Sequence, residues 1–456
     1  MQMNNMINGK KISVLGAGVS GAALAALAAK HGAKVFVSDA KEISKETEEF
    51  FKANGIMWEA SGNTELLLDA DVIVVSSGIS PKNEMLVEAG KRGITVIGEL
   101  DFVSPYLSGT IIAVTGSNGK TTTTSMIGHL LAEAGCNVIT CGNIGIPVAK
   151  AADSNYDFIV MELSSFQLYW AKTFRCDAAV VCNLAPDHID WHGSYENYVA
   201  SKANIIKCLS CGGAAIYQKR DEAVLGAASD VISLPMSWGP CLKDKNGIYM
   251  DSEASSAWLN NGGCSSCKKL FDFSSVKLLG SHNLENSAMA MTVLALFEIE
   301  AAAGSIENYV PPKHRCAYAG EVKGVTFVDD SKGTNVAATL TAMSSLPGGK
   351  VIILGGQGKG EDYAPLAEGA IKYTKCAVLL GSEKDKIASA LSAAGYNAFT
   401  KVNDMDEAVE AAYIKASAGE TVLLSPACTS WDMYPNYGAR GDHFVRAAKK
   451  IIERES

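Results

Sequence analysis

A glycine-rich segment that begins at residue 116 has the residue types of a phosphate-binding loop. The apolar stretch 111–114 runs into Thr115 and then into Gly116, Ser117, Asn118, Gly119, Lys120 and Thr121, and a helix is expected from Thr122. Glycines let backbone amides close on phosphate oxygens, lysine adds positive charge, and a threonine hydroxyl can ligate Mg²⁺. The common nucleotide-binding pattern has glycine where Val114 stands, but Gly-Lys-Thr between a strand and a helix still predicts ATP binding.

Two further side chains follow predicted strands and suit a metal bound beside the nucleotide. Glu162 comes directly after the strand 158–161, and His188 lies in a loop after the strand 178–182. Ligands bind at the carboxyl ends of strands in open α/β sheets, so both side chains are expected to hold Mg²⁺ between the phosphates and an acceptor carboxylate. The run His188-x-Asp190-x-His192 is equally compatible with a solvated loop or a transition-metal site.

A second glycine-rich loop lies near the N-terminus. Gly16, Gly18 and Gly21 stand between a predicted strand and a predicted helix, and Asp39 ends the next strand. This is the dinucleotide fingerprint, and alone it favours an NAD-dependent oxidoreductase. Nothing downstream in the sequence resembles a hydride-transfer site, and that function leaves the ATP loop unexplained. The same geometry binds the pyrophosphate of a UDP-sugar equally well.

The chain alternates the strands and helices that must position these loops. Strands are expected at 11–15, 34–37, 72–76, 95–97, 110–114, 137–140, 158–161, 178–182, 325–329, 350–354, 377–380 and 421–425, and helices between them include 22–30 and 283–299. This rhythm predicts parallel, doubly wound sheets. From 233 to 275 the chain is rich in Gly, Ser, Asn and Cys, which favours short strands and loops in a small antiparallel excursion.

The fold class is therefore α/β with three domains. A chain of 456 residues exceeds what a single core supports. The strand pattern pauses at 106–109, and Pro311-Pro312 marks a linker because tandem prolines cannot continue a helix. We expect a Rossmann-like domain over 1–108, a central ATP-binding domain over 109–310, and a second Rossmann-like domain over 311–456.

Composition excludes several classes of protein. A net charge of −9 argues against binding to nucleic acid. The uncharged run 12–29 resembles a signal peptide or membrane anchor, but its glycines stand where a strand-turn-helix needs them, and no other apolar stretch could span a bilayer. Twelve scattered cysteines indicate free thiols in a reducing, cytoplasmic compartment. The pairs Cys208/Cys211 and Cys264/Cys267 lie too far apart in the sequence for a shared zinc ribbon.

Taken together, the motifs resemble the Mur ligase family, and they cover nearly the whole chain in the family's order. They are the segment 115–123, Glu162, the Asp187-His188 loop, Lys202, the segment 281–286, His314-Arg315 and the segment 330–335. The resemblance implies an ATP-dependent amide ligase. ATP would phosphorylate the carboxylate of a UDP-muramoyl substrate, and the amine of an amino acid would attack the acyl phosphate. Such chemistry depends on positioning and charge neutralisation.

The resemblance also implies roles for individual residues in binding ATP and metal. Lys120 and the loop around it would contact the phosphates, Thr121 and Glu162 would hold one Mg²⁺, and His188 and Lys202 a second. Lys202 would first be carbamylated by CO₂, which turns a cation into an anionic oxygen ligand; on the residues alone it reads as an exposed helical lysine. Asn283 and Asn286 resemble the adenine contacts, Asp330 the ribose contact and Arg315 a phosphate contact from the third domain, while His282 is structural.

The UDP-linked substrate and the amino acid have their own residues by the same resemblance. The UDP part would lie near Gly18, Val19, Ser20, Asp39 and Ser76, with Asn143 and His188 on the sugar-linked portion. The segment 424–441 and the N-terminal loop resemble the family member that adds D-glutamate. Its two carboxylates need cations and hydrogen-bond donors, which match Lys332, Thr334, Lys359 and Ser430.

Some alternatives stay open. Tyr437 stands where the family has phenylalanine, and the segment 355–360 is also compatible with a simple turn or a second phosphate loop. A ligase that adds a different amino acid, and a degenerate ligase retained as a binding protein, are both compatible with the motifs. The resemblance implies small-molecule substrates and a monomer.

Overall fold

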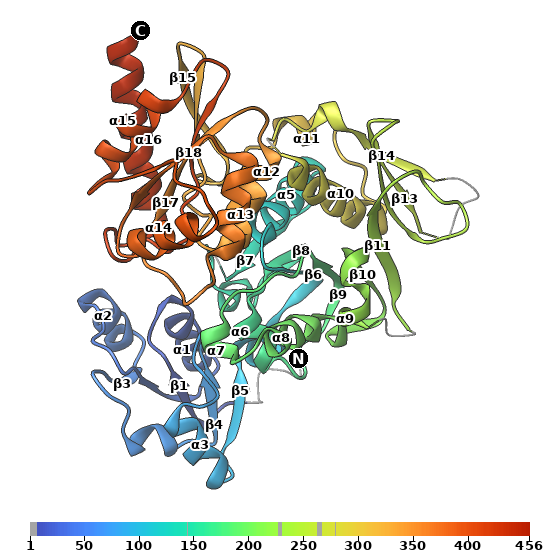
Figure 1. Cartoon of the computed structure of the whole chain (residues 1–456). Coiled ribbons are helices and arrows are strands. Elements are labelled where there is room, and N and C mark those ends of the chain that lie inside the picture. Colours follow the sequence, from blue (N-terminus) through green and yellow to red (C-terminus); the bar gives the residue numbers. More distant parts are fainter. Residues whose placement is uncertain (1–6, 144, 227–229, 262–266, 279) are drawn as a thin grey trace. The chain divides into compact units, whose positions relative to one another are not determined.

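Three β-sheets organise the chain and confirm the α/β fold class (Figure 1). The computed structural model describes residues 7–143, 145–226, 230–261, 267–278 and 280–456. The chain divides into two compact units: unit 1 comprises Met1–Leu184, Glu196–Phe273 and Ser287–Ile306, and unit 2 comprises Ala185–Tyr195, Ser274–Asn286 and Glu307–Ser456. No helix in the described part of the chain has both the length and the apolar character that a bilayer span requires.

The first sheet has five parallel strands in the order β3-β2-β1-β4-β5. The strands are β1 (Lys11–Leu15), β2 (Lys34–Ser38), β3 (Met57–Glu59), β4 (Val72–Val75) and β5 (Thr95–Gly98). The helices are α1 (Val19–Lys30), α2 (Lys45–Ala53), α3 (Glu84–Lys91) and α4 (Glu99–Val103), with 3₁₀ turns at Glu65–Leu68 and Ser104–Tyr106. The chain order reverses between β1 and β4, so the loops after these two strands border the crevice where such sheets bind ligands.

The second sheet has nine strands in the order β14-β13-β12-β11-β10-β9-β6-β8-β7. The strands are β6 (Ser108–Thr115), β7 (Val138–Gly142), β8 (Asn155–Glu162), β9 (Cys176–Val181), β10 (Leu209–Gln218), β11 (Ile232–Trp238), β12 (Gly247–Asp251), β13 (Ser256–Asn260) and β14 (Lys268–Asp272). Only β12, β13 and β14 pair antiparallel, which confirms the expected antiparallel excursion. The sequence patterns missed β10, whose register shifts between Leu209 and Ala214.

Short and long helices connect these strands. They are α5 (Lys120–Glu133), α6 (Ser165–Trp170), α7 (Ile189–His192), α8 (Tyr195–Lys207), α9 (Glu222–Leu225), α10 (Ser281–Leu296) and α11 (Ser305–Asn308), with 3₁₀ turns at Val148–Ala151, Lys219–Asp221 and Phe273–Ser275. Helix α5 begins at Lys120, two residues before the predicted start at Thr122. Gly119 precedes it with a φ of 82°, and this left-handed turn lets the helix begin at once.

The third sheet lies within unit 2 and has the order β15-β16-β20-β17-β18-β19. Its strands are β15 (Ala317–Val322), β16 (Val325–Asp329), β17 (Lys350–Gly355), β18 (Cys376–Leu380), β19 (Phe399–Lys401) and β20 (Thr421–Leu424). The helices are α12 (Val336–Ser345), α13 (Ala364–Tyr373), α14 (Lys384–Ala393), α15 (Met405–Lys415) and α16 (Tyr437–Glu455). Only the β15–β16 pair is antiparallel, so this domain is also doubly wound.

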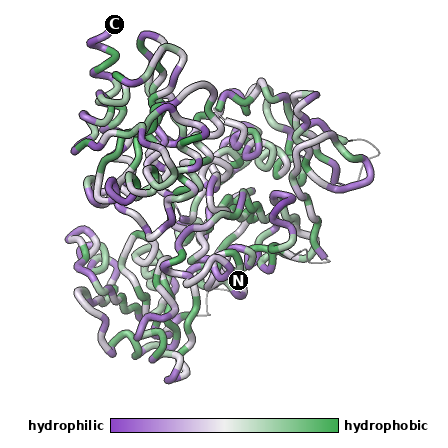
Figure 2. Tube along the Cα trace, in the orientation of Figure 1, coloured by the Kyte–Doolittle hydropathy of each residue, from purple (hydrophilic) through white to green (hydrophobic). Residues whose placement is uncertain are grey.

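Hydrophobic strands and amphipathic helices form the cores that pack against these sheets. In Figure 2 the C-terminal helix α16 alternates between hydrophobic and hydrophilic segments along its length. Its buried positions include Phe444, Ala447, Ala448 and Ile451, which recur at the spacing of one helical face. Phe444 packs in the same core as Phe327 of β16, so this face attaches the helix to the third sheet.

The cysteines correct one prediction. Cys241 and Cys267 form a disulfide, whereas free thiols were expected throughout. The connection from β11 to β12 passes beside the end of β13, where Asn260 Nδ2 donates to the carbonyl of Leu242 at 2.9 Å, and this brings Cys241 to the start of β14. Nine other cysteines are unpaired, including Cys208 and Cys211, and Cys264 lies outside the described residues.

Candidate active site

The predicted phosphate loop connects β6 to α5, and its glycines are required by its surroundings. Gly116 has a φ of 144°, and a Cβ there would lie 3.0 Å from Cys182 Cβ and 3.2 Å from the backbone of Asn183. Lys120 Nζ donates to the carbonyls of Gly116 and Ser117 at 2.9 and 3.0 Å. The Lys120 side chain therefore folds back over the loop, where its positive charge is expected to contact the phosphates.

Asn183, which follows β9, holds this loop in shape. Its carbonyl accepts from Ser117 N at 2.8 Å, its Oδ1 accepts from Asn118 N at 2.9 Å, and its Nδ2 donates to the Asn118 carbonyl at 3.0 Å. The Ser117 hydroxyl lies 2.9 Å from the hydroxyl of the buried Tyr198 on α8. Sequence reasoning missed both residues as loop supports, because only the tertiary structure brings them to the loop.

Glu162 connects two of the predicted site residues. It ends β8, is only 1% exposed, and accepts from Thr121 Oγ1 at 2.7 Å through Oε2 and from Asn143 Nδ2 at 3.0 Å through Oε1. Carboxylate and hydroxyl oxygens beside a phosphate loop are the ligands Mg²⁺ takes, so these residues fit the ion. Asn143 was expected to contact the sugar-linked part of the substrate; here its amide group meets Glu162.

Lys202 lies beside the same loop. It is 2% exposed on α8, and its Nζ donates to the Gly116 carbonyl at 2.7 Å and lies 4.9 Å from the centre of the Tyr198 ring. The alternative of an exposed helical lysine is therefore wrong. Thr121, Glu162 and Lys202 surround the loop from three elements, α5, β8 and α8.

The N-terminal loop has the packing of a dinucleotide fingerprint. A Cβ at Gly21 would overlap the carbonyl oxygen of Gly16, so helix α1 starts as close to the loop as glycine permits. Gly18 precedes α1 with no side-chain cap, and Val19 is 75% exposed. Asp39 Oδ2 accepts from Ala17 N at 2.7 Å, so this carboxylate holds the loop itself. Gly16 also packs on Ser76, which places the loops after β1 and β4 together.

Unit 2 contains the residues expected at the adenosine. Asn283 and Asn286 are buried and hydrogen-bonded to each other at 3.2 Å. Asp330 is 8% exposed and accepts from Ser425 Oγ at 2.7 Å and from Cys316 N at 3.3 Å. Burial raises the pKa of Asp330 to about 7, while these hydrogen bonds and Arg315 act in the opposite direction.

The residues expected at the amino acid also lie in unit 2. Lys332 Nζ lies 4.2 Å from the centre of the Tyr437 ring, so two of them are in direct contact. Ser430 is 2% exposed, and its hydroxyl makes no hydrogen bond within the described chain. Thr334 N donates to the Lys332 carbonyl at 2.8 Å in a tight turn.

A network of buried hydrogen bonds supports the loops that carry these residues. Arg440 is 2% exposed and donates to Ser331 Oγ at 3.0 Å, to the Ser331 carbonyl at 2.8 Å and to the Thr429 carbonyl at 3.0 Å. His314 Nδ1 lies 2.6 Å from Asp329 Oδ2, and this hydrogen bond raises the pKa of His314. Arg440 lies in the segment 424–441, and the structure shows that it joins the loops that contain Lys332 and Ser430.

Asp187 was part of a predicted motif, but the residues that it contacts emerge only from the structure. It is 7% exposed, and its Oδ1 lies 3.3 Å from Lys359 Nζ. Its Oδ2 accepts from Asn335 Nδ2 at 3.2 Å and lies 3.6 Å from His188 Nε2. Among the described residues there is no group of three or more His, Cys, Asp and Glu side chains that could hold a metal ion.

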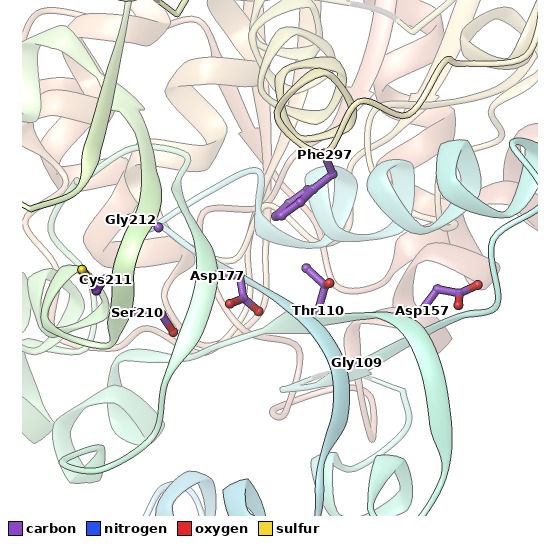
Figure 3. Close-up of a pocket in the computed structure, with 9 residues that line it drawn as sticks. Gly109, Thr110, Asp157, Asp177, Ser210, Cys211, Gly212 and Phe297 are labelled. Atoms are coloured by element: carbon purple, nitrogen blue, oxygen red, sulfur yellow. The ribbon is translucent and has the colours of Figure 1, made fainter.

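A cavity of about 560 Å³ in unit 1 is distinct from these residues. Figure 3 shows Thr110 between Asp157 and Asp177, with the ring of Phe297 above them. These residues lie near the amino ends of β6, β8 and β9, whereas the phosphate loop follows the carboxyl end of β6. Both carboxylates accept a backbone N–H at 2.8 Å, from Asn137 and Ile111 respectively, so they stabilise the strands.

Three family models match this chain. The MurD N-terminal domain matches residues 11–85, the Mur ligase middle domain residues 114–294, and the Mur ligase glutamate ligase domain residues 314–428. The UDP-N-acetylmuramoylalanine–D-glutamate ligase of Christiangramia forsetii is 36% identical over 450 residues, 97% of this chain and 100% of the relative. The enzyme of that name from Acidobacterium capsulatum is 36% identical over 455 residues, 96% of each chain.

Solved structures show the same fold. The UDP-N-acetylmuramate–alanine ligase of Thermotoga maritima superposes with a TM-score of 0.57 at 17% identity, covering 97% of this chain and 100% of that one. A pseudomurein peptide ligase of Methanothermus fervidus has the same score at 18% identity and the same coverage. The chain has a phosphate loop held by Asn183, and Glu162 accepts a hydrogen bond from the loop threonine, Thr121. Its relatives match it over nearly their full length. The chain therefore belongs to the Mur ligase family.

Proposed function

We propose that this chain is an ATP-dependent ligase that joins D-glutamate to UDP-N-acetylmuramoyl-L-alanine in peptidoglycan precursor synthesis. The observation that carries the proposal is the Thr121–Glu162 hydrogen bond of 2.7 Å at the phosphate loop, in a chain whose full-length relatives bear the name of this activity. ATP activates the alanyl carboxylate as an acyl phosphate, the amine of D-glutamate attacks it, and ADP and phosphate are released.

In the first step the chain's own residues position ATP and neutralise its charge. The loop residues Gly116, Ser117, Asn118, Gly119, Thr121 and Thr122 and the start of α5 enclose the phosphates, with the amides of Ser117 and Asn118 held by Asn183. Lys120 turns from the loop carbonyls toward the phosphates. Thr121 and Glu162 hold one Mg²⁺, which offsets negative charge on the phosphates. The buried pair Asn283 and Asn286 contacts adenine, Asp330 the ribose, and Arg315 a phosphate.

Lys202 and His188 hold a second Mg²⁺ in this proposal. Two observations support this role for Lys202: its side chain is 2% exposed, and its Nζ lies 2.7 Å from the Gly116 carbonyl of the phosphate loop. An ammonium group at this position would repel a bound cation. Carbamylation, in which Nζ loses a proton and bonds to the carbon of CO₂, would supply an anionic carbamate oxygen of the kind that Mg²⁺ prefers.

D-glutamate binds in unit 2, where cations and donors suit its two carboxylates. Lys332 and Lys359 supply charge, Thr334 a hydroxyl, and Tyr437 supports Lys332 through its ring. Ser430 is the sharpest support, because a buried hydroxyl without a partner costs about 1–3 kcal/mol and a substrate carboxylate removes that cost. Lys332 also faces the developing charge of the reaction as a catalytic residue.

The UDP-linked substrate binds the first domain. Gly18, Val19 and Ser20 lie at the uncapped start of α1, where a diphosphate finds backbone amides, and Ser76 borders the loop from β4. Asp39 orders the loop, and Asn143 and His188 contact the sugar-linked part. We propose the domain boundaries 1–108, 109–310 and 311–456, a monomeric state, and a cytoplasmic location, where ATP and nucleotide precursors are made.

A substrate panel tests the proposal. Phosphate release from ATP is measured with UDP-N-acetylmuramoyl-L-alanine and one amino acid at a time: D-glutamate, L-glutamate, L-lysine or diaminopimelate. We expect D-glutamate to stimulate release far more than the others and a UDP-linked dipeptide to form in equal amount. Preference for another amino acid would place the chain elsewhere in the family, and no stimulation by any would exclude the ligase.

A further inference from the structure

Glu361 holds the start of helix α12, next to the predicted amino-acid pocket. The side chain of Asn335 caps this ten-residue helix, since its Oδ1 accepts from Ala338 N at 2.7 Å. The next backbone amide, Val336 N, donates to Glu361 Oε2 at 2.9 Å. Thr334, predicted to bind D-glutamate, directly precedes this cap. A carboxylate at this position is favoured by the helix dipole as well as by the hydrogen bond.

A second carboxylate, that of Asp187, reaches the same helix start and also pairs with Lys359. Asp187 Oδ2 accepts from the capping residue Asn335, and Asp187 Oδ1 lies 3.3 Å from Lys359 Nζ. The Lys359 side chain is 16% exposed and that of Asp187 is 9% exposed, so this ion pair is poorly screened. Asp187 and Glu361 therefore lie within electrostatic reach of each other around one ammonium group.

Other charged groups near this cluster are engaged elsewhere. Glu383, at the start of α14, bonds Lys386 at 2.7 Å and the Tyr363 hydroxyl at 3.2 Å. Asp362 accepts from Ala364 N at 2.9 Å at the start of α13. His188 Nε2 lies 3.6 Å from Asp187 Oδ2, whereas Lys359 Nζ lies 3.3 Å from the other oxygen, Oδ1. Lys359 pairs with Asp187, and its charge also acts on Glu361.

Burial makes the charge of Glu361 sensitive to pH near neutrality. Burial raises the pKa of Glu361 to about 7, and the negative charge of Asp187 acts in the same direction. The Val336 N–H bond and Lys359 oppose this shift. As the pH rises through this range, Glu361 loses its proton and adds a negative charge near Asp187 and Lys359.

We propose that Glu361 is a residue that sets the affinity for the amino-acid substrate, by competing with the substrate's carboxylate for Lys359. The inference rests on the proposed function, in which Lys359 binds D-glutamate. A protonated Glu361 keeps its place at the helix start and leaves Lys359 to Asp187 and the substrate. An ionised Glu361 repels the incoming dicarboxylate, so binding of D-glutamate is accompanied by uptake of a proton.

The experiment compares the full-length enzyme with Glu361→Gln between pH 6 and pH 8.5, at saturating ATP, Mg²⁺ and UDP-N-acetylmuramoyl-L-alanine. Glutamine has the shape of the protonated acid and can accept the Val336 N–H bond. We expect the two enzymes to have similar KM for D-glutamate at pH 6. At pH 8.5 the wild-type KM should be about three- to tenfold higher than that of the variant, the effect of one partly screened like charge.

The matched control is Asp362→Asn, which removes the neighbouring exposed carboxylate and should leave the pH dependence of the KM unchanged. The KM for ATP should not differ between the three proteins. A constant wild-type-to-variant ratio of KM for D-glutamate at every pH would overturn the inference, as would a variant with raised KM throughout.

Calorimetry gives a second readout that does not depend on turnover. D-glutamate is titrated into the wild-type complex with a non-hydrolysable ATP analogue and the UDP-linked substrate at pH 7.5, in buffers of different ionisation enthalpy. Wild type should take up more protons than Glu361→Gln, and equal uptake would contradict the proposal. If no amino acid is ligated at any pH, the proposed function itself fails; ligation of D-glutamate without the pH difference overturns only the role of Glu361.

Discussion

Thr121 Oγ1 lies 2.7 Å from Glu162 Oε2, and this hydrogen bond joins the first turn of α5 to the last residue of β8. Thr121 is 4% exposed and Glu162 1% exposed, so the pair is held in a buried setting beside the phosphate loop. Asn143 orders the other carboxylate oxygen at 3.0 Å. A pre-ordered oxygen pair of this kind reduces the reorganisation that metal binding would otherwise require.

Glu162→Gln should reduce turnover by at least about a hundredfold, because an amide cannot replace the anionic oxygen that compensates for the cation's charge. Phosphate release is measured across a range of Mg²⁺ concentrations, and half-saturation should move to higher Mg²⁺. Thr121→Ser is the matched control, since it keeps the hydroxyl. If Thr121→Ser lost as much activity as Glu162→Gln, the helix packing rather than the oxygen pair would be responsible.

Lys202→Ala should abolish ligation and recover part of it in added acetate or formate, which supply a small carboxylate in place of the carbamate. Lys207→Ala on the same helix is the control, because Lys207 is exposed. The measurement is the ligation rate with increasing acetate. A lack of rescue in a variant that is folded and still binds ATP would count against a carbamate at Lys202.

Ser430→Ala should have opposite effects on stability and on substrate binding. The buried hydroxyl has no hydrogen-bond partner in the described chain, so its removal should leave the free energy of unfolding unchanged or raise it by up to about 1 kcal/mol. The KM for D-glutamate should rise about tenfold, with the KM for ATP unchanged. Ser425→Ala provides the contrast: Ser425 Oγ bonds Asp330 at 2.7 Å and Thr339 at 3.1 Å, so its loss should destabilise by about 1–2 kcal/mol. Thermal melts and kinetics separate the two effects.

Gly21→Ala should destabilise the protein by about 1–3 kcal/mol, because the added methyl group overlaps the Gly16 carbonyl oxygen. Gly90→Ala in α3 should stabilise it by about 0.5–1 kcal/mol, since that glycine is helical and has open space around it. Chemical denaturation measures both. Equal effects of the two substitutions would show that helix propensity, and not the close approach of α1 to the loop, decides the outcome.

Asp330 should make stability decline with rising pH. Its folded pKa of about 7 lies above the ordinary value of 3.8, so the folded protein binds the extra proton and the resulting stability is lost as pH rises through about 7. Glu361 contributes with the same sign. Melting temperatures between pH 5.5 and 8.5 should fall less steeply in Asp330→Asn than in wild type. An identical slope in the two proteins would contradict a raised pKa at this carboxyl group.

Local sequence was sufficient for the parts of this protein whose structure depends on neighbours along the chain. The strand before Gly116 and the helix after it are properties of a contiguous segment, and the alternating strands and helices predicted the three sheets. β3 and β19 escaped prediction because each is an edge strand of only three residues, and the edge strand β15 was also missed. β10 escaped because the bulge between Leu209 and Ala214 breaks its pattern. The order of the motifs along the chain then indicated the family.

Only the tertiary structure decided which side chains meet. Asn183 holds the phosphate loop from 65 residues away and Asp187 meets Lys359 across 172 residues, separations that carry no periodic signal. The burial of Lys202 and Asp330 and the partial burial of Glu361 are likewise properties of packing, because a helix or loop segment does not indicate what will cover it. Residue types therefore predicted the chemistry, whereas the protonation states and supporting contacts depend on long-range packing that no local pattern contains.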